Sequence, residues 1–237
     1  MLYHVNAVNT AERSLYMDLT TTEKYALTVL EARGKLSALQ RETQALYLAA
    51  SCIWDMMQAG AVTEDGEGKL MVSAPLPKTI SYCGPVYEWL GKKPIKKEKA
   101  ALKYISALTN KRIKALVKII ADDLIGKSVL VVEQQGKAKR CHVDLTAIAE
   151  DLEAIRDMEG AVTPDQLMLA ELLLDSKAAK KLLNKKELSS MKKAVKQANG
   201  SFHVYIGEVK KYYDTVTAII LVCIAVSAAT VGPILLW

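Results

Sequence analysis

The sequence predicts a mainly α fold: a single globular helical domain with small β-hairpins and a central apolar helix at its C-terminal end. Ala, Leu, Lys and Glu dominate the 237 residues, whereas Phe occurs once and Gly and Pro number only 12 and 6. The dominant residues have high helix propensity, and sparse Gly and Pro leave room for long helices. Apolar residues make up 51% of the chain, which is enough for a sizeable core.

The N-terminal region divides into an arm and the start of the domain. Residues 1–18 show no strong pattern and are expected to form an arm, with the domain spanning 19–237. Thr20 and Glu23 have the spacing of a capping box, in which the hydroxyl accepts a hydrogen bond from a first-turn amide and the carboxylate reaches back. The first helix is therefore expected to begin here, and Gly34 is expected to end it.

The next elements are predicted to be a helix, a hairpin and a short helix. Apolar residues at helical spacing predict a core helix from about Thr43 to Gln58, which Gly60 stops. A polar turn that contains glycine predicts a hairpin within 61–72. Three prolines then indicate an irregular crossing before a short helix at 86–90.

The second half is expected to contain four helical segments and one hairpin. Amphipathic spacing predicts helices at about 110–125 and 145–158. β-Branched residues on both sides of Gln-Gln-Gly-Lys predict a hairpin at 129–143. Thr163 is expected to cap a further helix that begins with a proline, and 177–197 has the pattern of a lysine-rich amphipathic segment.

The final run, Thr215 to Trp237, contains no charged residue. About 20 apolar residues span a bilayer as a helix, so this run is long enough to cross a membrane. A helix enclosed by protein has the same composition. Lys210 and Lys211 before the run favour lipid, whereas its small residues and Gly232-Pro233 favour a core position. Both interpretations, core helix and membrane anchor, stay open.

The net charge of +6 arises from a local concentration of basic residues. From Lys92 to Lys127, eleven Lys or Arg face three acidic residues, a balance of +8. Lys111, Lys114 and Lys118 fall on one side of the helix expected at 110–125. This side is either the solvated face of an amphipathic helix or a surface that attracts a polyanion such as lipid headgroups or nucleic acid.

No pattern in the sequence indicates catalysis, a bound metal ion or a cofactor. Asp122 and Asp123 point about 100° apart on a helix, so surface residues are expected rather than a catalytic dyad. The four cysteines show no metal or disulfide spacing and are expected to be reduced core thiols. The sequence contains no Walker A loop, nucleophile elbow or dinucleotide fingerprint. The protein is therefore expected not to be an enzyme.

Five segments follow one another in a distinctive order over residues 19–231. They are LTTTEKYALTVLEARGKL, ALYLAASCIWDMMQAGAV, ALTNKRIKALVKIIADDLIGKSVLVVEQQGKAKRCHVDLT, TPDQLMLAELLLDSKAAKKLL and the apolar tail. Together they resemble the Golgi phosphoprotein 3 family. The resemblance implies a peripheral membrane protein with one mainly α-helical domain, whose last apolar helix packs in the core.

The resemblance also implies a lipid site. Eukaryotic members bind phosphatidylinositol 4-phosphate in a basic pocket and hold glycosyltransferases, their membrane-protein clients, in the Golgi. Of the positions that align with the pocket, which are Leu39, Leu48, Lys114 and Val117, only Lys114 is basic. Arg41, Lys111 and Lys118 are close enough in the sequence to substitute loosely for the other basic residues of the pocket. The implied lipid headgroup-binding residues are therefore Arg41, Lys111, Lys114 and Lys118.

The hairpin at 129–143 has a second implied role, in self-association or membrane contact. The hairpin residues for which this role is implied are Val131, Val132, Lys137, Lys139 and Arg140. The resemblance therefore implies a homo-oligomer as one further partner.

Three functions follow as hypotheses. The first is a non-enzymatic adaptor that binds anionic lipid at the cytoplasmic face of a membrane, because residues 1–18 lack the apolar region of a secretory signal. The second is a tail-anchored protein that uses 215–237 as its membrane span. The third is a nucleic-acid binder, because a basic helix followed by a basic hairpin has the order of a winged helix; interleaved aromatic residues are lacking, so this is the least favoured of the three.

Overall fold

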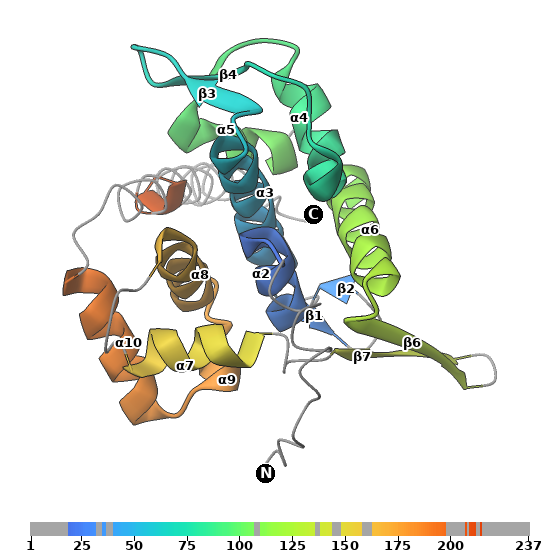
Figure 1. The fold of residues 1–237 in the computed structure, drawn as a ribbon, viewed down its shortest axis with the longest axis vertical. Coiled ribbons are helices and arrows are strands. Elements are labelled where there is room, and N and C mark those ends of the chain that lie inside the picture. Colours follow the sequence, from blue (N-terminus) through green and yellow to red (C-terminus); the bar gives the residue numbers. More distant parts are fainter. Residues whose placement is uncertain are drawn as a thin grey trace, which may run out of the picture.

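The computed structural model describes most of the expected domain (Figure 1). Helices account for 72% of the described residues, which confirms the mainly α prediction. The expected arm at 1–18 and the apolar run at 215–237 lie outside the described residues. The described residues are 19–31, 35–36, 40–106, 110–135, 138–143, 148–157, 163–197, 207, 209–211 and 214.

Two helices, α2 (Thr21–Val29) and α3 (Arg41–Gln58), pack against each other at the centre of the molecule. In Figure 1 they lie between α6 on one flank and α7 to α10 on the other. Every residue of α3 from Gln44 to Met56 is buried. This confirms the expected core helix, and Gly60 follows it with a φ of +68°, a conformation that glycine adopts without strain.

The N-terminus of α2 has the expected capping box. The Thr20 hydroxyl accepts a hydrogen bond from the Glu23 amide at 3.3 Å, and the Glu23 carboxylate accepts one from the Thr20 amide at 2.9 Å. Two of the unpaired amides at the start of the helix are thereby satisfied.

The prediction that Gly34 ends the first helix is wrong, because α2 stops at Val29. Leu30 turns to an extended conformation and begins β1 (Leu30–Glu31), which pairs in antiparallel fashion with β2 (Lys35–Leu36). The pairing sets Leu30 opposite Leu36, and both side chains are buried. The chain therefore leaves the helix where Leu30 can pair with Leu36 in the interior.

A three-stranded antiparallel sheet follows α3. Its first two strands, β3 (Val62–Glu64) and β4 (Lys69–Val72), form the hairpin that was expected within 61–72. The third, β5 (Ile95–Lys96), pairs with β4 and sets Ile95 opposite Leu70. A strand of two residues is too short for a sequence pattern, so β5 was not predicted.

The segment between β4 and α6 is more helical than expected. It contains the 3-10 helix η1 (Lys78–Cys83), α4 (Gly84–Leu90) and α5 (Lys97–Ser106). The last of these was not predicted as a helix. Its buried side includes Tyr104, whose ring meets that of Trp89 edge-on at 5.6 Å between centroids.

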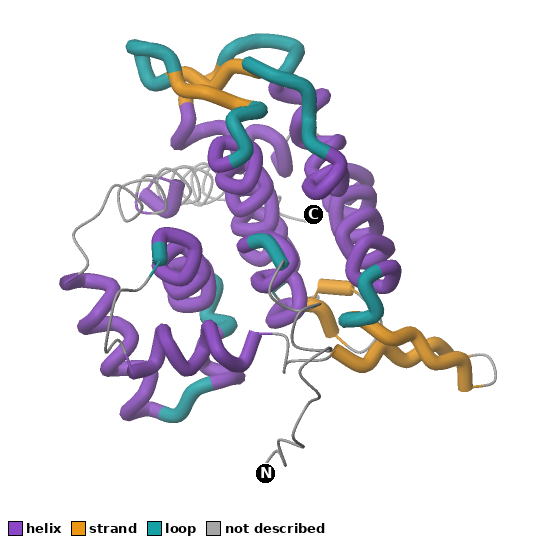
Figure 2. Tube along the Cα trace, in the orientation of Figure 1, coloured by secondary structure: helices purple, strands orange, loops and turns teal. Residues whose placement is uncertain are grey.

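Helix α6 (Asn110–Gly126) leads into the hairpin of β6 (Leu130–Gln135) and β7 (Ala138–Val143). Both elements lie where the sequence predicted them. The hairpin register sets Leu130 opposite Val143. The two strands project from the body of the molecule (Figure 2).

The remaining described helices form a group on the other flank (Figure 1). They are α7 (Ala149–Asp157), α8 (Pro164–Asp175), α9 (Ala179–Leu182) and α10 (Lys185–Gln197). Thr163 caps α8 as predicted. The segment expected to be one amphipathic element at 177–197 is two helices, because Asn184 caps α10 by accepting hydrogen bonds from the amides of Lys186 and Glu187 at 2.9 and 3.0 Å.

Two further expectations concern the core. Cys52 and Cys83 are buried free thiols, as predicted. Within the described ranges, no helix combines the length and the apolar character that a membrane span requires. The run at 215–237 lies outside the described residues, so its position as core helix or membrane anchor stays a prediction.

Candidate functional site

The outer side of α6 is a row of exposed lysines. Lys111, Lys114 and Lys118 are exposed, whereas the apolar residues of the opposite side are buried. That buried side consists of Ile113, Leu116, Val117, Ile120 and Leu124. We call Lys111, Lys114 and Lys118 the α6 lysine face.

An apolar residue continues this face towards the end of the helix. Ile125 is 41% exposed, an unusual position for a large aliphatic side chain. It follows Lys118 by seven residues, and two helical turns hold about 7.2 residues, so both lie on the same side of α6. The face is therefore cationic along most of its length and apolar at its end.

One of the three lysines has a partner within the described part of the chain. Lys118 forms an ion pair with Asp122 one turn later, and both side chains are more than half exposed. Exposed ion pairs of this kind contribute little to the stability of the protein, because water screens the two charges. Lys118 can therefore exchange Asp122 for another anion at small cost.

Arg41 belongs to a different helix from the α6 lysine face. It opens α3, it is half-buried and it takes part in an interaction within the protein. The four residues proposed for a lipid headgroup are thus three exposed lysines on one helix and one engaged arginine on another. This arrangement fits a charged surface better than a closed pocket.

The hairpin residues are described to different extents. Val131 is 48% exposed on β6. The backbones of Val132, Lys139 and Arg140 lie in the ladder, which sets Val132 opposite Cys141, Gln134 opposite Lys139 and Glu133 opposite Arg140. Their side chains, and Lys137 as a whole, lie outside what the structure describes.

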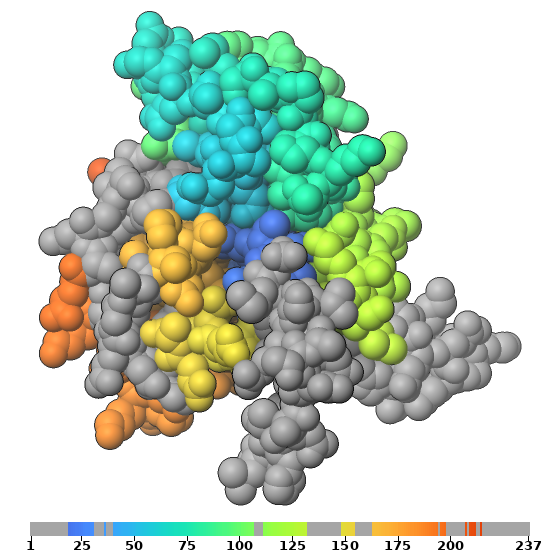
Figure 3. Space-filling model, viewed as in Figure 1, coloured from blue at the N-terminus to red at the C-terminus, as the bar shows by residue number. Residues whose placement is uncertain are grey.

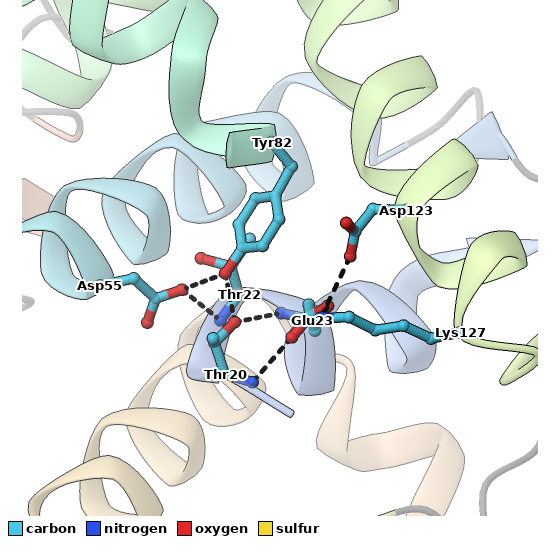
Figure 4. Close-up of polar contacts among 7 residues, drawn as sticks. All are labelled: Thr20, Thr22, Glu23, Asp55, Tyr82, Asp123 and Lys127. Carbon is cyan, nitrogen blue, oxygen red and sulfur yellow. Dashed lines mark hydrogen bonds and ion pairs between the residues drawn. The ribbon is translucent and has the colours of Figure 1, made fainter. Parts of the chain in front are cut away.

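A largely buried polar cluster at the C-terminal end of α6 joins this helix to α2 and α3 (Figure 4). Glu23, whose side chain has no exposed surface, forms an ion pair with Lys127, and Lys127 also lies 3.3 Å from the Asp123 carboxylate. Asp55 accepts hydrogen bonds from the Thr22 amide at 3.1 Å and from the Tyr82 hydroxyl at 3.0 Å. The cluster also includes Thr20.

Burial shifts the protonation of both central carboxyl groups. It raises the pKa of Glu23 to about 7; Asp123 adds to the rise, while Lys127 opposes it. Burial likewise raises the pKa of Asp55 to about 6, against the hydrogen bonds from Thr22 and Tyr82. Both groups therefore titrate near neutral pH.

Perturbed carboxyl groups occur at active sites and in structural networks alike. Here Glu23 is fully buried and Asp55 is 7% exposed, so neither can reach a substrate in solution. No group of three metal-ligating side chains occurs among the residues that the structure describes. The cluster is therefore interpreted as the support that holds the end of α6 against the central helices.

The expectation that Asp122 and Asp123 are both surface residues is met by Asp122 and only partly by Asp123. Asp122 is more than half exposed, but the Asp123 side chain is only 25% exposed and takes part in the cluster. Sequence reasoning also missed Glu23 beyond its capping role, and it missed Asp55 and Tyr82. A polar residue inside the apolar run of α3 was the available signal for Asp55.

A scan of the sequence against models of known protein families finds no match, and a search of curated proteins also finds none.

Proposed function

We propose that this chain is a non-enzymatic, peripheral membrane protein that binds anionic lipid through the α6 lysine face. The observation that supports the proposal is the position of Ile125 on the same side of α6 as the three exposed lysines. Cationic and apolar side chains on one exposed helix face match the two layers of a lipid surface, charged headgroups and hydrocarbon beneath them.

The expected affinity of this face is modest. Each lysine near an anionic surface contributes about 1 kcal/mol, so the three lysines together supply about 3 kcal/mol. That energy corresponds to roughly a hundredfold change in a dissociation constant. Binding by the face alone is therefore reversible and sensitive to salt, as suits a peripheral protein.

The resemblance to the Golgi phosphoprotein 3 family supports the same class of ligand. It favours a phosphoinositide-like headgroup, a membrane-protein client and self-association through the hairpin at 129–143. Exposure of Val131 on that hairpin supports the last of these. In this proposal the protein lies at the cytoplasmic face of a membrane and uses neither a metal nor a cofactor.

The test is flotation of the full-length protein with vesicles. Phosphatidylcholine vesicles and vesicles of equal parts phosphatidylcholine and phosphatidylserine are compared at low and high salt. We expect binding only to the anionic vesicles, lost at high salt. The triple variant Lys111→Glu, Lys114→Glu and Lys118→Glu should bind them more weakly.

A matched control separates local charge from net charge. Lys92, Lys93 and Lys96 are exposed and lie outside α6, so their triple replacement by glutamate changes the net charge by the same amount. This control should bind like the unmodified protein. Equal affinity of the α6 variant and the unmodified protein would contradict the proposal.

The alternative of a tail-anchored protein is supported by one specific observation, the uncharged run from Thr215 to Trp237. A tail anchor predicts a protein that needs detergent for purification and floats regardless of lipid charge and salt. Solubility without detergent together with salt-sensitive flotation is the opposite result, which the peripheral proposal predicts.

A further inference from the structure

A second lysine surface lies on α9 and α10. Seven lysines in these two helices are exposed, against one glutamate. We call this set the α9–α10 lysine face, and its members are Lys180, Lys181, Lys185, Lys186, Lys192, Lys193 and Lys196. The apolar side of the helices, with Ala179, Met191 and Val195, is buried.

Two acidic groups near this surface, Glu187 and Asp175, already have partners within the protein. The Glu187 carboxylate accepts a hydrogen bond from the Asn184 amide at 2.8 Å, where it belongs to the cap of α10. Asp175, which precedes α9, forms an ion pair with Lys210 at 2.8 Å. No ion pair joins a lysine of the face to a carboxylate within the described ranges. Among the described residues, the positive charge of this face is therefore not paired with a carboxylate.

The two lysine faces lie on opposite flanks of the molecule. In Figure 1, α6 and α10 are separated by the central helices α2 and α3, and Figure 3 shows α6 and α10 at opposite edges of the surface. Helix α6 packs inward on η1, α2 and β6, while α10 packs on α7, α8 and α9. The exposed sides consequently point away from each other, and one flat bilayer cannot meet both.

We infer that the α9–α10 lysine face is a second binding surface for anionic lipid, so that the protein bridges two bilayers. The inference rests on the proposed function of the α6 lysine face, which would hold the first bilayer. With α6 on one membrane, the seven lysines of α9 and α10 face the opposite direction and meet the second.

The composition of the face favours lipid over nucleic acid. Residues 177–197 contain no arginine and no aromatic residue. Arginine supplies the bidentate contacts to phosphate and base edges, and aromatic rings supply stacking on bases. Lysines clustered on one side of an amphipathic helix are instead typical of segments that bind anionic lipid. The occupant is therefore assigned as an anionic bilayer.

The experiment mixes two vesicle populations that carry a donor and an acceptor dye. Both contain equal parts phosphatidylcholine and phosphatidylserine, and energy transfer reports clustering by the full-length protein, while flotation of one population reports binding. The unmodified protein should float and cluster the vesicles. The variant Lys186→Glu, Lys192→Glu and Lys193→Glu should still float and should lose clustering. Circular dichroism checks that each variant is folded.

The α6 triple variant distinguishes failure of this inference from failure of the proposed function. If both hold, that variant binds more weakly and also fails to cluster, and flotation disappears when both triple changes are combined. If the α6 variant binds less but the α10 variant clusters vesicles like the unmodified protein, the bridging inference is overturned. If only the α10 variant loses flotation, the proposed function fails instead.

Two alternative interpretations, a dimer and a nucleic-acid surface, predict different experimental results. A dimer formed through the hairpin could cluster vesicles with two copies of the α6 lysine face, and clustering would then survive in the α10 variant. A nucleic-acid surface on α10 would be seen as binding of short duplex DNA that the α10 variant loses, with clustering unchanged. Either result contradicts the inference.

Discussion

The fully buried carboxyl group of Glu23 forms an ion pair with Lys127, which lies 104 positions later in the chain. Glu23 also caps α2, so one side chain fixes the start of the first described helix and the residue that follows α6. The orientation of the α6 lysine face therefore depends on a contact inside the protein.

Removal of the Lys127 ammonium should leave a buried carboxylate without its partner. For Lys127→Met we expect a loss of about 1–3 kcal/mol in the free energy of unfolding at pH 8, where Glu23 is ionised. Urea unfolding measures the change. At pH 5 Glu23 is protonated and the loss should be smaller.

The control for this variant is Lys118→Met. Its ion pair with Asp122 is exposed, so the expected loss is at most about 0.5 kcal/mol. Equal losses for the two variants would mean that Lys127 contributes no more than a surface charge.

Stability should fall as the pH rises through the range in which Glu23 and Asp55 titrate. Their pKa values are raised from 4.5 to about 7 and from 3.8 to about 6, so the folded state binds more protons than the unfolded state within these windows. The free energy of unfolding is therefore highest at pH values below the pKa of the unfolded state. It declines as the pH rises to the pKa of the folded state. For Glu23 the decline between pH 5 and 8 is about 3 kcal/mol.

The variant Glu23→Gln isolates this effect. It should flatten most of the pH dependence between 5 and 8 in urea unfolding, because the amide does not titrate. The exposed Glu150 provides the matched variant, Glu150→Gln, which should keep the slope. A slope that persists in Glu23→Gln would assign the dependence to other groups.

The hydrogen bond from Tyr82 to Asp55 should contribute measurably to stability. Tyr82→Phe removes a donor at 3.0 Å from a buried carboxylate, and we expect a loss of about 1–2 kcal/mol. Tyr87→Phe removes a hydroxyl of the same kind from an exposed bond to the Ala74 carbonyl at 2.9 Å, so its loss should be clearly smaller. Thermal and urea unfolding compare the two.

The cap of α8 should behave as a local unit. Thr163→Ala removes the acceptor of the Gln166 amide and should cost about 1 kcal/mol, whereas Thr163→Ser keeps the hydroxyl and should cost little. Neither change should alter vesicle binding, because Thr163 belongs to neither lysine face. If Thr163→Ala remained fully folded and still lost vesicle binding, α8 would take part in the membrane contact.

Local patterns determined which segments become helices and hairpins. The capping boxes at Thr20 and Thr163, the amphipathic spacing of α6 and the β-branched residues of the hairpin at 129–143 are each patterns of neighbours a few residues apart. Such interactions are encoded within a short window, so these elements were predictable. The lysines of the α6 lysine face could be placed on one side of their helix for the same reason.

Three features depended on tertiary contacts alone: the residue at which α2 ends, the burial and ion pair of Glu23, and the orientation of the two lysine faces. Leu30 leaves the helix because it pairs with Leu36. Glu23 lies buried where α2 packs on α3 and α6, and Lys127 and Asp123 reach it from the end of α6. Periodicity states which residues share a side of a helix, but it carries no information on which helix covers that side. The positions of α6 and α10 on opposite flanks follow from the packing of both on the central helices and their neighbours, a relationship between distant segments that no local pattern contains.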